Sequence, residues 1–183
     1  MASTAPHVVA RCLLVQITKR TYEAGVTAGA LVQRFGSKRA LLLTLTERVA
    51  DWTGEMFAGL RAASTSPLGA LRGYADCLAQ MGESPGGLAH HLAYLQIDLA
   101  DPDFHKHVQR QARATRLEIR KLLDEGRTAG ELAPATDTVR LARTVEAIVG
   151  GSLLAWAFYR EGAVKQWVQE DLESVLMPHL SRA

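Results

Sequence analysis

The segment from residue 24 to residue 41 reads AGVTAGALVQRFGSKRAL, and this pattern predicts the end of one helix, a tight turn and a second, short helix. Gly25 can adopt the left-handed conformation that closes a helix, and Thr27 can cap the helix that follows. At 100° per residue, the apolar residues of the short helix fall on one side: Ala28, Leu31, Val32 and Phe35. That side anchors the helix, and the opposite side is available to a partner.

The available side of this short helix carries groups that suit DNA. Gln33 has the paired amide groups that recognise adenine, and Arg34 can bond guanine or a phosphate. Small residues at the start of the helix allow its end to approach a groove closely. Ser37 is placed to cap the next helix, whose first backbone amides form a phosphate clamp with Lys38. We therefore expect DNA contacts from six residues: Thr27, Ala28, Gly29, Gln33, Arg34 and Lys38.

The positive charge of the chain is concentrated near its N-terminal end. Residues 1–40 carry six basic side chains against one acid, a net charge of +5, whereas the remaining residues carry 15 basic and 18 acidic side chains. A basic head on a mildly acidic body suits a protein that contacts a polyanion at one end. The alternative is that these charges only solvate two short helices.

The whole chain is predicted to be all-α. Apolar residues recur at intervals of three and four, and no window alternates with the period of a strand. Three helix starts show a capping residue followed by proline: Ser66-Pro67, Ser84-Pro85 and Asp101-Pro102. Gly130 is placed to end a long helix. Behind the short helix we expect six helices, over residues 37–63, 67–81, 85–99, 102–128, 137–160 and 163–180.

The last two predicted helices carry more apolar surface than one core contact requires. Extra apolar surface indicates a partner, and Gly150 and Gly151 in mid-helix suggest a close approach of helices. A symmetric interface of two helices from each protomer satisfies both observations, although the same helices could pack on their own body. The expected dimer interface comprises Ile148, Val149, Leu153, Phe158, Trp167, Val168, Leu172 and Val175.

The turn and short helix resemble the helix-turn-helix of the TetR/AcrR family of transcriptional regulators. In that family an A-G-V-[ST] turn leads into a recognition helix and then an F-x-[SN]-K step, which correspond to residues 24–27 and 35–38. The DPDF start at Asp101 and the G-E-L turn at residues 130–132 are also typical of family bodies. The resemblance implies a body that encloses a small-molecule pocket, with the last two helices forming the dimer.

The N-terminal residues depart from the family pattern. Over residues 1–23 the stretch is short and atypical: Arg20-Thr21 replaces an Ile-Ala pair, and the usual Gly-aromatic turn does not occur. Val32 stands where a tyrosine that contacts phosphate is usual. These departures leave open a second function, a dimeric small-molecule-binding or adaptor protein whose degenerate head does not bind DNA.

An effector pocket is expected inside the body, where apolar bulk is mixed with a few polar tips. The same residues could equally be ordinary core. The expected lining comprises Trp52, Met56, Tyr74, Cys77, Met81, His91, Tyr94, Phe104 and Trp156.

Other classes of function find little support in the sequence. No nucleophile, nucleotide-binding or HExxH pattern occurs, so we expect no enzyme and no cofactor. The two cysteines lack a metal-ligand or disulfide pattern, and a metal site would have to come from scattered histidines and an acid: His90, His91, Asp98, His105 and His107. No apolar run of about 18 residues and no signal peptide are apparent, which favours a cytoplasmic protein without a membrane partner.

The sequence as a whole predicts a two-part regulator. Residues 1–40 form a helix-turn-helix head, and residues 41–183 form a helical-bundle body for effector binding and dimerisation. The expected partners are a palindromic double-stranded operator, a small-molecule effector that releases the protein from DNA, and a second copy of the chain.

Overall fold

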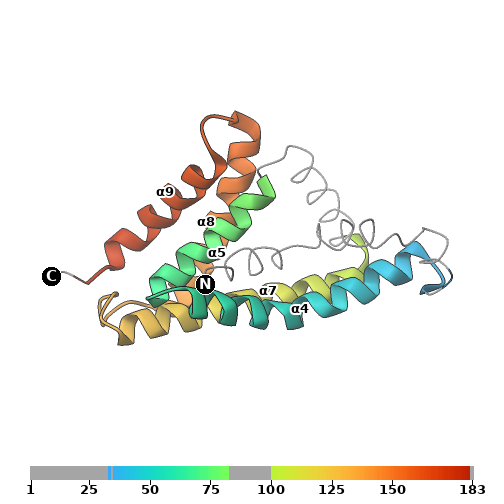
Figure 1. Cartoon of the computed structure of the whole chain (residues 1–183), viewed down its shortest axis with the longest axis horizontal. Helices are drawn as coiled ribbons and strands as arrows, with labels where there is room; N and C mark the ends of the chain where they lie inside the picture. Colours follow the sequence, from blue (N-terminus) through green and yellow to red (C-terminus); the bar gives the residue numbers. More distant parts are fainter. Residues whose placement is uncertain (1–32, 34, 83–99, 182–183) are drawn as a thin grey trace, which may run out of the picture.

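The computed structural model describes residues 33, 35–82 and 100–181, and over these residues the chain is helical (Figure 1). The α-helices are α4 (Lys38–Ala63), α5 (Pro67–Gly82), α7 (Pro102–Thr128), α8 (Thr138–Tyr159) and α9 (Val164–Leu176), and the 3₁₀ helix η1 (Met177–His179) follows. Within the described residues no strand occurs, and the β-type pairing there is an isolated bridge between Leu132 and Leu180. The all-α prediction is confirmed.

The helix starts follow from local capping chemistry. Ser37 Oγ accepts from the Ala40 amide at 3.0 Å, and a carboxylate oxygen of Asp101 accepts from the Asp103 amide at 2.9 Å, with Pro102 at the first turn. Ser66 Oγ accepts from an amide in the first turn of α5. Each cap satisfies amides that have no partner inside the helix. The predicted starts at these three positions are confirmed, whereas Ser84-Pro85 and the expected helix 85–99 lie outside the described residues.

The helix ends are set by residues in the left-handed region. Gly130 follows α7 with a φ of 77°. Arg160 caps α8 with a φ of 52°, a backbone conformation that is uncommon for residues other than glycine. The last helix is shorter than predicted, because Pro178 removes the amide that would bond back to Ser174 and its ring crowds that carbonyl. The chain therefore continues after Leu176 as η1.

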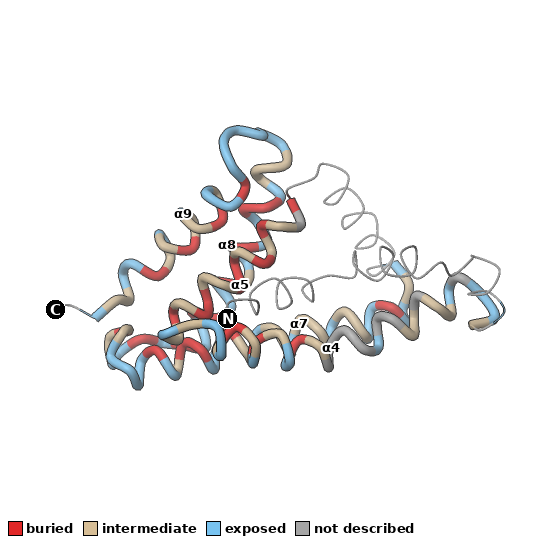
Figure 2. Tube along the Cα trace, in the orientation of Figure 1, coloured by how far each residue is buried: buried red, intermediate tan, exposed pale blue. Residues whose placement is uncertain are grey.

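The helices form a long pair and a packed group at one end of it (Figure 1). α4 and α7 lie side by side and run in the same direction, because Arg39 meets Asp101 near their starts and Arg61 meets Glu125 near their ends. α8 packs on α5, α7 and α9, and α5 packs on α9. Figure 2 shows buried residues on the facing sides of these helices. One hydrophobic core therefore joins all five α-helices.

The core is built from fully enclosed aliphatic side chains with one aromatic stack. Phe57 and Tyr74 stack with ring centroids 5.0 Å apart. Burial of one leucine-sized side chain contributes about 1.5–3 kcal/mol, so this set dominates the stability of the body. The largest fully buried side chains are Phe57, Leu71, Ile119, Leu122, Leu123, Leu132, Leu172 and Leu176.

α8 is the most apolar helix of the described part of the chain. By length and composition alone, Thr138–Tyr159 would be able to span a membrane. Its buried face instead packs within the protomer, through residues such as Val145 and Val149, which are 0% exposed. An apolar helix of this length is what a central element of an all-helical core requires.

Candidate functional site

The structure describes only the end of the predicted DNA-reading helix. Gln33 is helical and exposed, Phe35 is half-buried, and Gly36 ends the helix in the left-handed region with φ of 75°. Ser37 then caps α4, so that the predicted clamp amides stand at a helix N-terminus. The other expected DNA contacts, Thr27, Ala28, Gly29 and Arg34, lie outside the described residues. Lys38 is the first residue of α4, and its side chain is likewise outside them.

Arg39 joins the first turn of α4 to the first turn of α7. Its Nη2 lies 3.0 and 2.9 Å from the two carboxylate oxygens of Asp101, its Nε lies 3.2 Å from Oδ2 of the same residue, and Nη2 also lies 2.8 Å from Asp103 Oδ2. The guanidinium stands 5.7 Å from the ring centroid of the buried Phe104, within reach of a cation–π contact. We name these four residues the junction cluster.

The electrostatics of the junction cluster favour the charged forms of Arg39, Asp101 and Asp103. Hydrogen bonding to Arg39 holds the pKa values of Asp101 and Asp103 below their usual range, and the Asp103 amide lowers that of Asp101 further. The same bonds, first to Asp103 and then to Asp101, raise the pKa of Arg39. Sequence reasoning counted Arg39 only as part of the basic head, because its acidic partners lie 62 and 64 residues away.

Three further contacts between titratable side chains follow the seam between α4 and α7. His107 Nε2 lies 3.8 Å from Glu47 Oε1 about two turns along α4. Near the far end, Arg61 lies 2.8 Å from Glu118 and 3.1 Å from Glu125. Charged contacts therefore join the two helices both near their starts and near their ends.

The expected effector-pocket residues divide into three groups. Tyr74 and Cys77 are buried in the main core, and Met56 and Trp156 pack against it. Trp52 is half-buried on α4, whereas Phe104 lies under Arg39 at the start of α7. The side chain of Met81 and both His91 and Tyr94 lie outside the described residues. The structure thus brings together four of the nine: Met56, Tyr74, Cys77 and Trp156.

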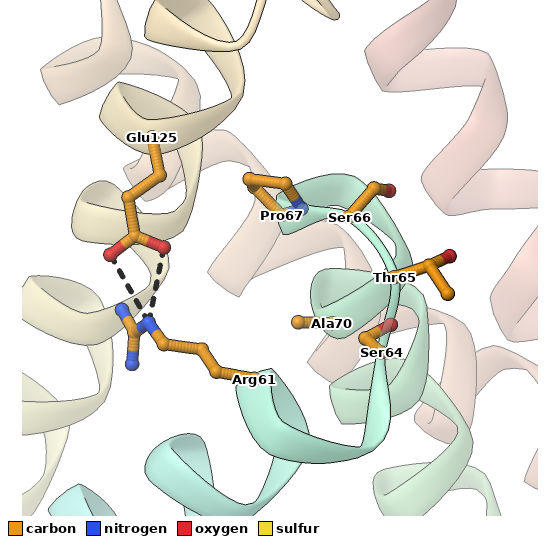
Figure 3. A pocket seen from close by; sticks show the side chains of 7 residues that line it. All are labelled: Arg61, Ser64, Thr65, Ser66, Pro67, Ala70 and Glu125. Carbon is orange, nitrogen blue, oxygen red and sulfur yellow. Dashed lines mark hydrogen bonds and ion pairs between the residues drawn. The ribbon is translucent and has the colours of Figure 1, made fainter.

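A pocket of about 180 Å³ opens beside the turn between α4 and α5, and Figure 3 shows its lining. None of the expected effector residues lines it, and its volume is below the range of about 300–1,000 Å³ that is usual for ligand pockets. Its one cation, Arg61, is turned toward Glu125, as the dashed lines in Figure 3 show. We assign no ligand to it. Its lining residues are Arg61, Ser64, Thr65, Ser66, Pro67, Ala70 and Glu125.

The expected dimer residues do not all reach the surface of the protomer. Val149, Val168 and Leu172 are 0% exposed in the protomer, and Leu153 is 6% exposed, because these side chains fill the core between α8 and α9. They leave no appreciable area for a partner to cover. The other members stay accessible to different degrees: Ile148, Trp167 and Val175 are half-buried, and Phe158 is 77% exposed.

The outer side of α8 presents an apolar stripe that the sequence analysis assigned only in part. At 100° per residue, the exposed positions in the second half of the helix fall on the side opposite to the core. Gly150 and Gly151 lie on this side, where an added Cβ would meet no atom within 4 Å. Among the described residues, no helix makes the close approach expected at these glycines. The stripe comprises Ala147, Gly150, Gly151, Leu154 and Phe158.

The histidines of the described part do not assemble a metal site. His105 is exposed, and His107 faces Glu47 across the seam. In residues 33, 35–82 and 100–181, no group of three or more His, Cys, Asp or Glu side chains has a metal-binding arrangement. His90, His91 and Asp98 lie outside those residues.

Comparisons with known proteins agree with this architecture. The chain is similar to the reduced form of NemR of E. coli, with 19% identity over 99% of this chain and 100% of that chain and a TM-score of 0.68. It is also similar to the ketosteroid transcriptional regulator KstR2 of Mycobacterium tuberculosis, with 17% identity over 100% of this chain and 97% of that chain and a TM-score of 0.58. At such identities the two likenesses show a common fold. No curated protein matches the sequence.

A family profile supplies the sequence evidence that the two structures do not. The profile of the tetracyclin repressor-like C-terminal domain matches residues 70–172, more than half of the chain. The matched region takes in α5 from Ala70 onward, all of α7 and α8, and α9 as far as Leu172, which together supply most of the core. The resemblance seen in the N-terminal motif is thus confirmed by a family match over a different part of the chain, residues 70–172. This protein belongs to the TetR family of transcriptional regulators and not to a family of enzymes.

Proposed function

We propose that this TetR-family protein is a cytoplasmic, homodimeric repressor that binds a palindromic DNA operator through its N-terminal heads and is released by a small-molecule effector bound in the body. The observation that carries the proposal is the exposed, helical position of Gln33, four residues before the N-cap of α4. An exposed side chain there is available to a partner, and the helix N-terminus at Ser37, where backbone amides favour a phosphate, follows four residues later in the chain.

The outer stripe of α8 supports the dimer. Leu154 is 40% exposed and Phe158 is 77% exposed, and the two glycines between Ala147 and Leu154 permit a partner helix to approach closely. Trp167 and Val175 on α9 add half-buried apolar surface. A two-fold axis along this face would pair α8 and α9 with their copies, and each residue of the stripe would then meet the same stripe of the partner.

A dimer of this kind suits an operator with two half-sites. Helix-turn-helix dimers place their recognition helices in successive major grooves, about 34 Å apart. An effector in the body would release the operator only if it binds more tightly to the state in which the heads have a different spacing, since equal affinity for both states shifts nothing. The core side chains gathered around Tyr74 and Cys77 are our candidates for its apolar surroundings.

Fluorescence anisotropy with a labelled duplex from the protein's own promoter tests the proposal. We expect salt-sensitive binding by the full chain, weakened by Gln33→Ala, Arg34→Ala or Lys38→Ala. Where a phosphate contact is lost, the slope of log affinity against log salt should fall by about 1. Arg113→Ala is the matched control, because Arg113 is exposed on α7 in the body.

The alternative function, a dimeric small-molecule-binding or adaptor protein with a degenerate head, predicts another result in the same experiment. The wild-type chain would then bind the duplex no better than an unrelated duplex at every salt concentration, and the three head substitutions would change nothing. Equal loss of affinity in Arg113→Ala would contradict the assigned face.

A further inference from the structure

The carboxylate of Asp101 performs two tasks with one orientation. One of its oxygens caps α7 by accepting from the Asp103 amide at 2.9 Å, and that same oxygen lies 3.0 Å from Arg39 Nη2. The other oxygen lies 2.9 Å from Nη2 and 3.2 Å from Nε. The rotamer that caps α7 is therefore the rotamer that holds Arg39, and loss of either contact weakens the other.

Arg39 stands at a position that is unfavourable without these partners. α4 and α7 run in parallel, so that their N-termini, each with a partial positive charge, lie at the same end of the seam. A cation in the first turn of a helix is disfavoured there. The carboxylates of Asp101 and Asp103 offset the partial positive charges of the two helix N-termini and the positive charge of the guanidinium. Arg39 is held in this turn by the start of α7.

The junction cluster lies next to the connection between body and head. Arg39 is two residues after the cap Ser37 and six residues after the exposed Gln33. Further along the seam, the pair between Glu47 and His107 is longer, at 3.8 Å, and the Arg61 pairs are at the other end of α4. A displacement of the first turn of α7 therefore acts on the end of α4 that precedes the head.

We propose that Asp101 and Arg39 form a coupling clamp, in which the capped state of α7 fixes the first turn of α4 and thereby the position of the head. Unwinding of the first turn of α7 turns the Asp101 carboxylate away and releases Arg39. Conversely, DNA that fixes the start of α4 favours the capped α7, because coupling between two sites is reciprocal. This inference rests on the proposed function where it concerns DNA, and on the structure alone where it concerns the two helix starts.

The first test uses the full chain without DNA and measures hydrogen exchange of the backbone amides in both helix starts. Asp101→Ser keeps a capping hydroxyl and removes the ion pair, whereas Asp101→Ala removes both. We expect Asp101→Ser to raise exchange at the start of α4 by a few-fold and to leave the start of α7 less affected. Asp101→Ala should raise exchange at both starts, by about fivefold at the start of α7.

Arg39→Gln separates a clamp from a merely local contact. It leaves the sequence of α7 unchanged, yet we expect faster exchange at His105 and Lys106 as well as at the start of α4. Arg61→Gln is the matched control, since it breaks ion pairs between the same two helices at their far end and should leave the two starts as in the wild type. Unchanged exchange at the start of α7 in Arg39→Gln, or the same change in Arg61→Gln, would overturn the clamp.

The second test adds the promoter duplex. We expect DNA to slow exchange at the start of α7 in the wild type and to have little such effect in Arg39→Gln. If the wild type binds DNA and the protection is equal in both proteins, the clamp does not couple to the head and the inference fails. If the wild type does not bind DNA, the proposed function fails, and the clamp is decided by the DNA-free measurement.

Discussion

Arg72 on α5 and Glu173 on α9 form a bidentate ion pair that joins the two helices, although the two residues are 101 positions apart in the sequence. Arg72 Nε lies 2.5 Å from Glu173 Oε1, and Nη2 lies 3.1 Å from Oε2. One turn away, the side-chain amide of Gln169 donates to Asp76 at 2.7 Å and to the Arg72 carbonyl at 3.0 Å, and Lys165 pairs with Asp76 at 2.9 Å. A polar network thus covers the edge of the core between α5 and α9.

Removal of this ion pair should lower stability modestly. Both side chains are more than a third exposed, so solvent screens the pair, and we expect Arg72→Ala to reduce the free energy of unfolding by about 1 kcal/mol. Urea denaturation measures the change. Glu161→Gln in the exposed loop after α8 is a control of similar chemistry and should stay within about 0.5 kcal/mol of the wild type.

The acid limb of the stability curve should depend on the same glutamate. Hydrogen bonding to Arg72 lowers the pKa of Glu173 below its ordinary range, so the folded state binds its proton less tightly than the unfolded state. The resulting stabilisation is complete above the unfolded value, about pH 4.3, and is lost as the pH falls through the lower folded value. Thermal unfolding between pH 7 and pH 3 should therefore show a smaller loss in Glu173→Gln than in the wild type. An identical loss in the two proteins would contradict this assignment.

Core leucines should differ sharply from an exposed leucine on the same helix. Leu122 on α7 is 0% exposed, and Leu122→Ala should cost about 2–5 kcal/mol because it leaves a cavity. Leu117, only five residues earlier, is 51% exposed, and Leu117→Ala should cost less than about 0.5 kcal/mol. Chemical denaturation of both variants checks the burial pattern. Similar losses in the two would contradict it.

The proposed dimer face can be blocked without disturbing the protomer. Gly150 has open space where a Cβ would stand, so Gly150→Leu should leave folding intact and improve helix propensity by roughly 1 kcal/mol. In the dimer, the new side chain would prevent the close approach of the two copies of α8. We expect light scattering to report a monomer for Gly150→Leu and for Phe158→Glu.

Leu117→Glu is the control for these two variants, because it places a charge at an exposed leucine of α7, outside the stripe. It should keep the oligomeric state of the wild type. A Gly150→Leu protein that dimerises as tightly as the wild type would show that the stripe is not the interface.

The sequence by itself determined the helical class, the family motif and most helix starts. Capping is local, because the hydroxyl of Ser37 and the carboxylate of Asp101 accept from amides two or three residues away. A few adjacent residues of the sequence are therefore enough to predict the helix start. The helix end at the left-handed Gly130 was predictable for the same reason. Pro178 also carried a local signal, which the prediction of a helix to residue 180 did not take into account.

Tertiary structure alone decided which apolar residues face the core and which charges meet. α8 has apolar residues on two sides, and no periodicity distinguishes Val149, which is 0% exposed, from Leu154, which is 40% exposed, until the neighbouring helices are in place. Arg39 finds its carboxylates 62 and 64 residues away, a distance that only the parallel packing of α4 on α7 closes. Short-range hydrogen bonds fix where helices begin, whereas burial and ion pairing depend on contacts between segments that are remote in the chain.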